Sequence, residues 1–390
     1  MIPTVMPTYA RADIVFEKGD GMYLFATDGR RYLDFGAGVA VNSLGHAHPH
    51  LVAALKAQAE KLWHCSNLYR VAGQEKVSKR LVEHTFADTV FFCNSGAEAM
   101  EGVIKLTRKY QYETGHHERY RIVVPRGAFH GRTLATIAAG GQEKHLKGFG
   151  PVVDGFDHVT YGDIAELRAA IGPQTAGILV EPIQGEGGIV AAKLDYLRAV
   201  RAIADEFGLL LAMDEVQTGN GRTGKLYAHE WAGITPDVMG TAKGLGGGFP
   251  IGAILATEKA AVGMTAGTHG STFGGNPLAM AAADAVLDIL LSDGFLEHVR
   301  QMGALLWDAL EKLVAAHPQV LETHRGAGLM QGLKCKVPST ALSKALLANG
   351  LLTVGAGDNV IRFVPPLIVE PQHIAEAVAL IDKSCKELAA

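Results

Sequence analysis

The segment from Leu209 to Gly248 constrains this chain more than any other. It begins with the apolar run Leu-Leu-Leu-Ala-Met, typical of a strand buried on both faces of a sheet, and the run ends at Asp214 and Glu215. A second short strand, predicted at 237–241, is followed by Lys243 among glycines. Because ligands of open α/β sheets bind at the carboxyl ends of the strands, we expect Asp214 and Lys243 to face one site.

A carboxylate and a lysine at two such strand ends are the groups that pyridoxal phosphate (PLP) needs. The lysine bonds to the cofactor carbonyl, and the carboxylate keeps the pyridine nitrogen protonated. The same features also occur where acidic residues only cap a helix, so on their own they leave both interpretations open. The run Gly219–Gly224 matches a dinucleotide-binding pattern but lies too far past the strand, and we interpret it as a turn-rich loop.

Composition excludes several classes of protein. A chain of 390 residues predicts two or three domains, and a net charge of −4 without a dense basic run argues against nucleic-acid binding. The four cysteines are far apart, which indicates free thiols rather than a metal site. His46, His48 and His50 alternate, but Pro49 favours a polar turn over a metal site. Without an apparent signal peptide or spanning segment, we expect a soluble cytoplasmic protein with no membrane partner.

The order of the predicted elements favours an α/β fold. Asp28-Gly29 between two apolar runs indicates an N-terminal hairpin. Strand and helix patterns then alternate, as in a mostly parallel sheet covered by helices. Strands are predicted at 89–93, 121–124, 176–180, 209–213, 237–241 and 251–256, with helices at 50–62, 75–85, 94–112, 194–207, 277–291 and within 294–316.

The turn Asn94-Ser-Gly-Ala-Glu joins a strand to a helix. Its backbone N–H groups and the positive end of the helix dipole can bind an anion, although Ser95 and Glu98 also fit a simple capping box. Farther on, Phe129 could cover a flat ring and Arg132 could bind a carboxylate. A core aromatic and a solvated arginine are the alternatives for these two residues.

The chain after Arg325 predicts a second, smaller α/β domain. Arg362 lies in an apolar strand there, and an arginine in that setting usually belongs to an exposed alternate face. The predicted strands are 329–336, 351–354 and 360–364, and the predicted helices are 340–348 and 371–388.

As an ordered set, the motifs of this chain resemble the class III (subgroup II) PLP-dependent aminotransferases, and within them most closely the acetylornithine branch. The resemblance covers essentially the whole chain. The motifs that carry it are Leu33-Asp-Phe, Asn42-Ser-Leu-Gly-His, Ser66-Asn-Leu-Tyr, Asn94-Ser-Gly-Ala-Glu-Ala, Phe129-His-Gly-Arg-Thr, Glu181-Pro-Ile-Gln-Gly-Glu-Gly-Gly, Asp214-Glu-Val-Gln, Ala242-Lys and Gly270-Ser-Thr-Phe-Gly-Gly-Asn-Pro.

The resemblance implies a fold-type I PLP-dependent transferase. Its large domain, 51–280, would hold a mostly parallel seven-stranded sheet. A smaller C-terminal α/β domain, 281–390, would pack with the N-terminal segment 1–50. The family also implies a homodimer whose active sites are shared between subunits.

Roles at the cofactor follow residue by residue from the resemblance. Lys243 would bond to PLP and move the proton during catalysis, and Asp214 would pair with the ring nitrogen. Phe129 and Val216 would cover the two ring faces, and Gln217 would approach the phenolic oxygen. The phosphate would be held by Ser95, Gly96, Ala97 and, from the neighbouring subunit, Thr272. Ala97 departs from the serine or threonine of many relatives and removes one hydroxyl donor.

Substrate roles are also implied by the resemblance. Arg132, with Ser271 nearby, would bind the α-carboxylate of acetylornithine, and Arg362 would bind the 2-oxoglutarate carboxylate next to the keto group. Glu186 would pair with Arg362 while the amino donor is bound. The reaction would move the δ-amino group to 2-oxoglutarate, giving N-acetylglutamate 5-semialdehyde and glutamate, a step of arginine biosynthesis.

Two alternatives remain open from the sequence. Another ω-aminotransferase of the group would use succinyl-diaminopimelate, succinylornithine, ornithine or 4-aminobutyrate as the donor. The small apolar run from Val39 to Asn42 leaves room for an acyl group, whereas an aromatic hydroxyl there would favour free ornithine. A non-catalytic binding protein is the second alternative, and the presence of both Lys243 and Asp214 argues against it.

Overall fold

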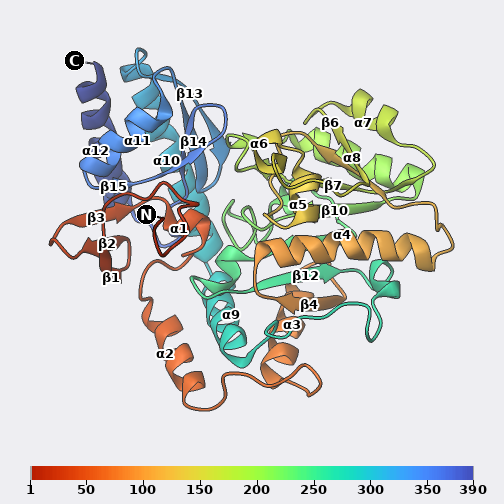
Figure 1. The fold of residues 1–390 in the computed structure, drawn as a ribbon. Helices are drawn as coiled ribbons and strands as arrows, with labels where there is room; N and C mark the ends of the chain where they lie inside the picture. Colours follow the sequence, from red (N-terminus) through yellow and green to blue (C-terminus); the bar gives the residue numbers. More distant parts are fainter. Residues whose placement is uncertain (1, 390) are drawn as a thin grey trace.

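A seven-stranded sheet forms the centre of the computed structural model, which describes residues 2–389 (Figure 1). One strand, β12, runs antiparallel to both neighbours, and the other strands are parallel to one another. The mostly parallel seven-stranded sheet that we expected is therefore confirmed. In sheet order the strands are β4 (Thr89–Cys93), β12 (Gly252–Ala256), β11 (Val238–Thr241), β10 (Leu210–Asp214), β7 (Thr175–Val180), β5 (Arg121–Pro125) and β6 (Phe156–Val159).

Helices cover both faces of this sheet, so its strands are buried on both sides. In β10, Leu211 and Met213 pack with residues of helix α8, while Leu210 and Ala212 pack with residues of helix α4. This alternation follows from the two-residue period of a strand. The helices of this part are α2 (Pro49–Ala59), α3 (Ala72–His84), α4 (Gly96–Glu113), α5 (Leu134–Gly140), α6 (Glu143–Leu146), α7 (Ile164–Ala170), α8 (Leu194–Phe207) and α9 (Pro277–Leu290).

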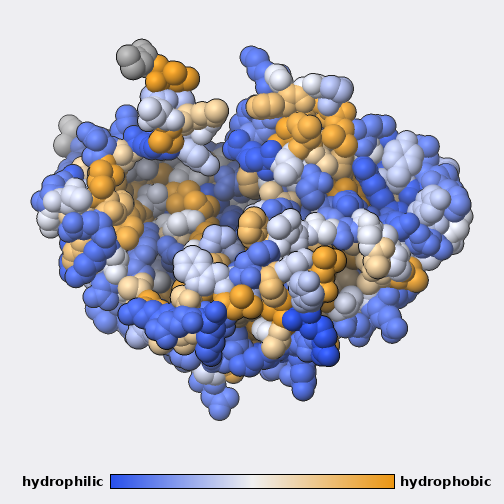
Figure 2. Space-filling view, turned by 60° about the horizontal axis from the view of Figure 1, so that its bottom comes forward, coloured by the Kyte–Doolittle hydropathy of each residue, from blue (hydrophilic) through white to orange (hydrophobic). Residues whose placement is uncertain are grey.

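Helices α2, α3 and α9 pack together below the sheet in the view of Figure 1. The same side is turned forward in Figure 2, where hydrophobic side chains gather among hydrophilic ones. No helix within residues 2–389 is long and apolar enough to cross a membrane.

The C-terminal part contains a second sheet covered by three helices. The sheet has the order β13 (Leu321–Ala327), β14 (Met330–Cys335), β17 (Val360–Phe363) and β16 (Val354–Ala356). The helices are α10 (Phe295–Ala316), α11 (Ser339–Ala348) and α12 (Pro371–Ala389).

The N-terminal segment is joined to this C-terminal part by strand pairing. The expected hairpin around Asp28-Gly29 is confirmed as β2 (Tyr23–Ala26) and β3 (Arg31–Asp34), and β1 (Phe16–Asp20) pairs with β2. Strand β15 (Leu351–Leu352), far along the chain, pairs in parallel with β3. After β3 comes the short turn α1 (Ala37–Ala40).

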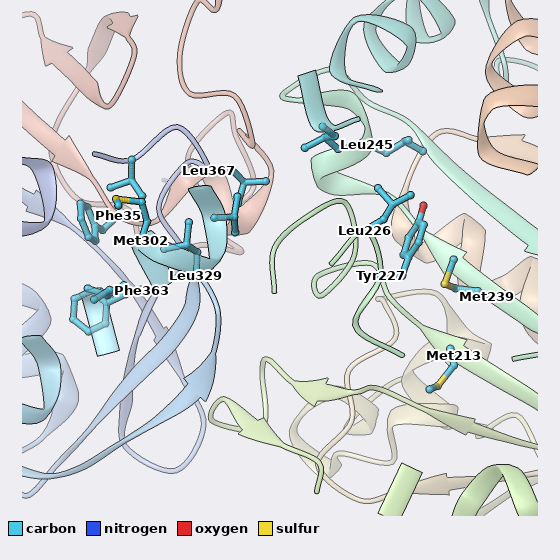
Figure 3. Close-up of a cluster of buried hydrophobic side chains, with 14 of the residues drawn as sticks. Phe35, Met213, Leu226, Tyr227, Met239, Leu245, Met302, Leu329, Phe363 and Leu367 are labelled. Carbon is cyan, nitrogen blue, oxygen red and sulfur yellow. The ribbon is translucent and has the colours of Figure 1, made fainter. Parts of the chain in front are cut away.

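One hydrophobic cluster runs through both parts of the molecule. It includes Met213 and Met239 in the large sheet, and Phe35, Phe363 and Leu367 on the N- and C-terminal side (Figure 3). Because burial of apolar side chains is favourable, this shared cluster holds the C-terminal part against the large sheet.

Several details differ from the sequence prediction, which also gave no strand at β6 and no helix at α5, α6 or α7. The predicted strand 351–354 is wrong as a single element, because β15 and β16 belong to different sheets. The region 294–316 is the single helix α10 rather than several helices. Strand β13 was not predicted because only its first residue is fully buried. The small ribbon of β8 (Ile183–Gln184) and β9 (Val190–Ala191) was also missed, being only two residues per strand.

Candidate active site

Strands β10 and β11 lie side by side and bring Asp214 and Lys243 to one edge of the sheet. Asp214 is the last residue of β10 and is opposite Gly240 of β11. Strand β11 ends at Thr241, two residues before Lys243. The backbone of Lys243 has a φ of 45°, in the left-handed region that a lysine rarely adopts. Such strain, of order 1–3 kcal/mol, occurs mainly where the surrounding structure holds a functional side chain in place.

The Asp214 carboxylate is buried and held by two hydrogen bonds. Its Oδ1 accepts from the backbone N–H of Val216 at 3.0 Å, and its Oδ2 lies 2.7 Å from Nδ1 of His130. In the sequence, His130 stands out only as part of the motif Phe129-His-Gly-Arg-Thr, from which no role could be inferred for it. The contact of His130 with Asp214 could not be recognised from the sequence, because the two residues lie on segments 84 residues apart.

A second buried carboxyl group, Glu181, lies directly after β7 and lines the same pocket. Its Oε2 accepts a hydrogen bond from the backbone N–H of Phe129 at 3.1 Å. Burial raises the pKa of Glu181 well above its usual range, and the neighbouring Asp214 acts in the same direction. Sequence reasoning missed this residue, although the signal was available: like Asp214, it ends a buried strand.

Burial also affects Lys243. Removal from water lowers the pKa of Lys243, while the Asp214 carboxylate opposes this effect. A lowered pKa makes the neutral amine easier to reach, and the neutral amine is the form that attacks a carbonyl carbon.

Helix α4 begins at the opposite wall of the pocket. Ser95 caps the helix, with its Oγ accepting from the N–H of Glu98 at 3.2 Å. The reciprocal half of the predicted capping box is wrong: the Glu98 carboxylate accepts instead from the backbone N–H of Asn94, at 2.6 Å. The N–H groups of Gly96 and Ala97 lie in the first turn of the helix, where no carbonyl of the helix itself can accept their hydrogen bonds.

These elements enclose a cavity of about 260 Å³. Eight of the residues predicted for the site line it, together with Glu181 and His130. The eight are Gly96, Ala97, Phe129, Arg132, Asp214, Val216, Gln217 and Lys243.

The residues present fit PLP, the cofactor predicted from the sequence. Lys243 can take its carbonyl group, Asp214 its ring nitrogen, and the start of α4 its phosphate. The wall at Gly96 is built for close approach, since a Cβ there would come within 2.7 Å of Val216 Cγ1.

Two arginines predicted for substrate binding differ in whether they are paired with a carboxylate. The guanidinium of Arg132 lies 5.6 Å from the ring centroid of Phe129, and within residues 2–389 it forms no ion pair. Arg362 is completely buried, so the exposed position that its strand pattern suggested is wrong. It donates to Gln217 Oε1 at 2.8 Å and pairs with Glu186 Oε1 at 2.8 Å.

Ser271 and Thr272 lie outside this cavity. Ser271 Oγ accepts from Asn94 Nδ2 at 3.1 Å and from the N–H of Gly274 at 3.0 Å. Thr272 is exposed at the surface of the chain. Within one subunit the structure therefore does not bring these two predicted residues to the pocket.

Comparison with known proteins gives consistent results. Residues 5–384 match the family model for class III aminotransferases. The chain is 62% identical to the acetylornithine aminotransferase of Brucella melitensis, covering 98% of this chain and 94% of that protein. It is 60% identical to acetylornithine aminotransferase 1 of Bradyrhizobium diazoefficiens, covering 98% and 95%.

Solved structures of similar fold include an ornithine aminotransferase and an N-acetylornithine aminotransferase. The ornithine aminotransferase from Toxoplasma gondii superposes with a TM-score of 0.95 at 32% identity, covering 99% of this chain and 93% of that one. The N-acetylornithine aminotransferase from Stenotrophomonas maltophilia gives a TM-score of 0.86 at 36% identity, covering 98% of both chains. The chain therefore belongs to the class III aminotransferases and is a PLP-dependent transaminase of the fold-type I architecture.

Proposed function

We propose that this protein transfers the δ-amino group of N2-acetylornithine to 2-oxoglutarate, giving N-acetylglutamate 5-semialdehyde and glutamate, as a step of arginine biosynthesis. The observation that carries the proposal is the contrast between two cations: Arg132 is unpaired in the described chain, and Arg362 is paired with Glu186. The names of relatives at 62% and 60% identity support the same donor.

When bound, PLP supplies an electron sink that stabilises negative charge at the reacting carbon of the substrate. Lys243 supplies the amine that holds the cofactor and the group that moves the proton at that carbon. Asp214 would offer an anion to the ring nitrogen, and Phe129 and Val216 would cover the ring faces. Gln217 would approach the phenolic oxygen while its own oxygen accepts from Arg362.

The two cations suit the two substrates. Acetylornithine carries one carboxylate, far from its reacting amine, and Arg132 at the pocket wall would bind it. The dicarboxylate 2-oxoglutarate needs a second cation beside its keto group, and Arg362 would supply it after Glu186 moves away. With Glu186 in place, the Arg362–Glu186 ion pair has no net charge to attract the wrong end of an amino donor.

Room for the acyl group comes from the segment after β3. Ala40 packs in a small apolar cluster with Ile183, and Ile183 lines the pocket. Residues 39–42 carry no hydroxyl side chain that could bind the free α-amine of ornithine. Another ω-aminotransferase activity, on succinyl-diaminopimelate, succinylornithine, ornithine or 4-aminobutyrate, is the alternative.

We also propose that the enzyme is a cytoplasmic homodimer with shared active sites. Five large apolar side chains are exposed on two loops, and we call them the apolar loop patch: Leu62, Trp63, Leu68, Tyr69 and Phe273. The two loops that carry it are tied together, since Asn67 Nδ2 donates to the carbonyl oxygens of Ser271 and Gly274 at 2.9 and 3.0 Å. Exposed apolar patches of this kind mark association surfaces, and Thr272 lies within this one, where it would reach a neighbour's phosphate.

For the domains, we propose a division at 1–50, 51–280 and 281–390, of which residues 1 and 390 lie outside the described part. The pairing of β3 with β15 supports packing of the first unit on the third. The bond from the N–H of Leu367 to the Ser43 carbonyl, at 2.7 Å, supports it as well.

A parallel titration tests the donor. Purified holoenzyme is mixed in single turnovers with acetylornithine, ornithine, succinylornithine and 4-aminobutyrate, and the change in cofactor absorbance is followed. We expect acetylornithine to react with the highest ratio of rate to half-saturating concentration. Faster reaction with ornithine or 4-aminobutyrate would support the alternative, and no spectral change with any amine would overturn both.

A further inference from the structure

The Asp214 carboxylate is positioned by two donors of different kinds. One is the backbone N–H of Val216, which any residue other than proline at that position would supply. The other is the side chain of His130, completely buried, whose Nδ1 lies 2.7 Å from Asp214 Oδ2. His130 follows β5 on a different segment from β10, so it fixes the carboxylate from a second direction.

The other ring nitrogen of His130 decides which way this bond runs. His130 Nε2 is buried and has no hydrogen-bond partner within residues 2–389. A proton on Nε2 would therefore be a buried donor without an acceptor, which is unfavourable. The favoured form is a neutral imidazole with its proton on Nδ1, so His130 donates and Asp214 accepts.

We infer that His130 is the positioning residue that keeps Asp214 an ionised acceptor aimed into the pocket, and thereby keeps the ring nitrogen of bound PLP protonated. The inference rests on the role of Asp214 in the proposed function. Donation from Nδ1 stabilises the ionised form of the carboxylate. An ionised carboxylate accepts a stronger hydrogen bond from the ring N–H than a neutral carboxyl group does, because hydrogen bonds to charged groups are stronger than neutral ones.

The neighbouring carboxyl group shows why Asp214 needs this support. Glu181 also lines the pocket, and within residues 2–389 its carboxyl group accepts one hydrogen bond, from the backbone N–H of Phe129. Burial raises the pKa of Glu181, which favours its neutral form. Of these two acidic groups, Asp214 is therefore the one with a histidine donor, and the proposed anionic role falls to it.

Two substitutions at the same position separate this role from mere packing. In His130→Asn the amide nitrogen can occupy the place of Nδ1 and still donate to Asp214. In His130→Gln the amide reaches the place of Nε2, so the donor to Asp214 is lost. His130→Phe fills the same space without any donor and gives the same comparison should His130→Gln fail to fold.

The chain also offers a matched control. His229 is a second buried histidine, with Nδ1 3.0 Å from the buried carboxylate of Glu215, but it does not line the pocket. His229→Gln therefore removes an equivalent histidine–carboxylate contact without touching Asp214.

The test uses holoenzymes loaded with PLP labelled with ¹⁵N in the ring. NMR reports whether the ring nitrogen is protonated, and gel filtration into cofactor-free buffer reports the rate of PLP loss. We expect a protonated nitrogen in the wild type, His130→Asn and His229→Gln. In His130→Gln we expect partial loss of that proton and PLP release about ten- to a hundredfold faster.

Wild-type nitrogen protonation and PLP release in His130→Gln would overturn the inference and leave the proposed function intact. Failure of His130→Asn to retain the protonated nitrogen would overturn it as well. Failure of the wild type itself to bind PLP would instead overturn the proposed function.

Discussion

At the residue scale, the ion pair between Glu186 and Arg362 leads to a direct prediction. Glu186→Gln leaves the buried guanidinium of Arg362 without its anionic partner, so a dicarboxylate should bind more readily beside the keto position. One charged hydrogen bond contributes about 1.5–3 kcal/mol, so we expect the KM for 2-oxoglutarate to fall roughly tenfold or more. Half-reaction kinetics with each substrate separately measure this.

The donor half-reaction should respond in the opposite way. With Arg362 unmasked, acetylornithine can bind in the reversed register, and its rate of reaction at low concentration should fall. Glu206→Gln, which breaks an exposed pair with Arg168 far from the pocket, is the control. Equal changes for both substrates would argue against a selective role of Glu186.

The sequence predicted where Asp214 and Lys243 would lie, but it did not predict the burial of Arg362 or the contact of His130. Asp214 and Lys243 could be placed because the carboxyl ends of adjacent strands meet at one edge. Burial of Arg362 could not be predicted, because it depends on Gln217 and Glu186 arriving from other segments. The contact of His130 with Asp214 depends in the same way on how two strand ends come together.

At the scale of elements, helix α4 closely approaches the segment before α5. We therefore expect that adding a single methyl group at Gly131 destabilises the protein. Gly131 has a φ of 135°, and a Cβ there would lie 2.8 Å from both Ala97 Cβ and Thr136 Oγ1. Gly131→Ala should therefore push on the phosphate end of α4 and move the neighbouring Arg132. We expect a loss of about 1–3 kcal/mol in the free energy of unfolding, with faster PLP release.

Gly115→Ala provides the matched comparison for this glycine. Gly115 also has a positive φ, 87°, but no atom would lie within 4 Å of a Cβ there. It should show the backbone penalty alone, with unchanged PLP release. Chemical denaturation and cofactor loss measured on both variants test the difference, and similar PLP release from the two would contradict the packing argument.

The elements themselves were predictable where one physical signal dominated. The predictions were correct for buried strands with apolar runs, such as β10, and for helices with clear starts, such as α9, which begins at Pro277 after the cap Asn276. The prediction failed at β13, whose residues are mostly exposed or half-buried. It also failed where β15 and β16 divide one apolar run between two sheets, because strand pairing depends on the tertiary structure.

At the scale of the whole molecule, shared active sites predict complementation between two defective subunits. Lys243→Ala removes the catalytic amine from its own subunit. Thr272→Asp places a carboxylate where the proposed dimer has a neighbour's phosphate, and because Thr272 is exposed in the single chain, this change should not disturb folding. Each variant alone should therefore have little activity.

A mixed dimer of the two variants distinguishes the arrangements. If Thr272 acts across the interface, one site of the mixed dimer contains both defects and the other contains neither, so about half of the wild-type activity per dimer should return. If Thr272 acts within its own subunit, each site carries one defect and activity stays low. Co-expression with two affinity tags isolates the mixed dimer, and Thr265→Asp, at an exposed threonine of the same loop, controls for the added charge.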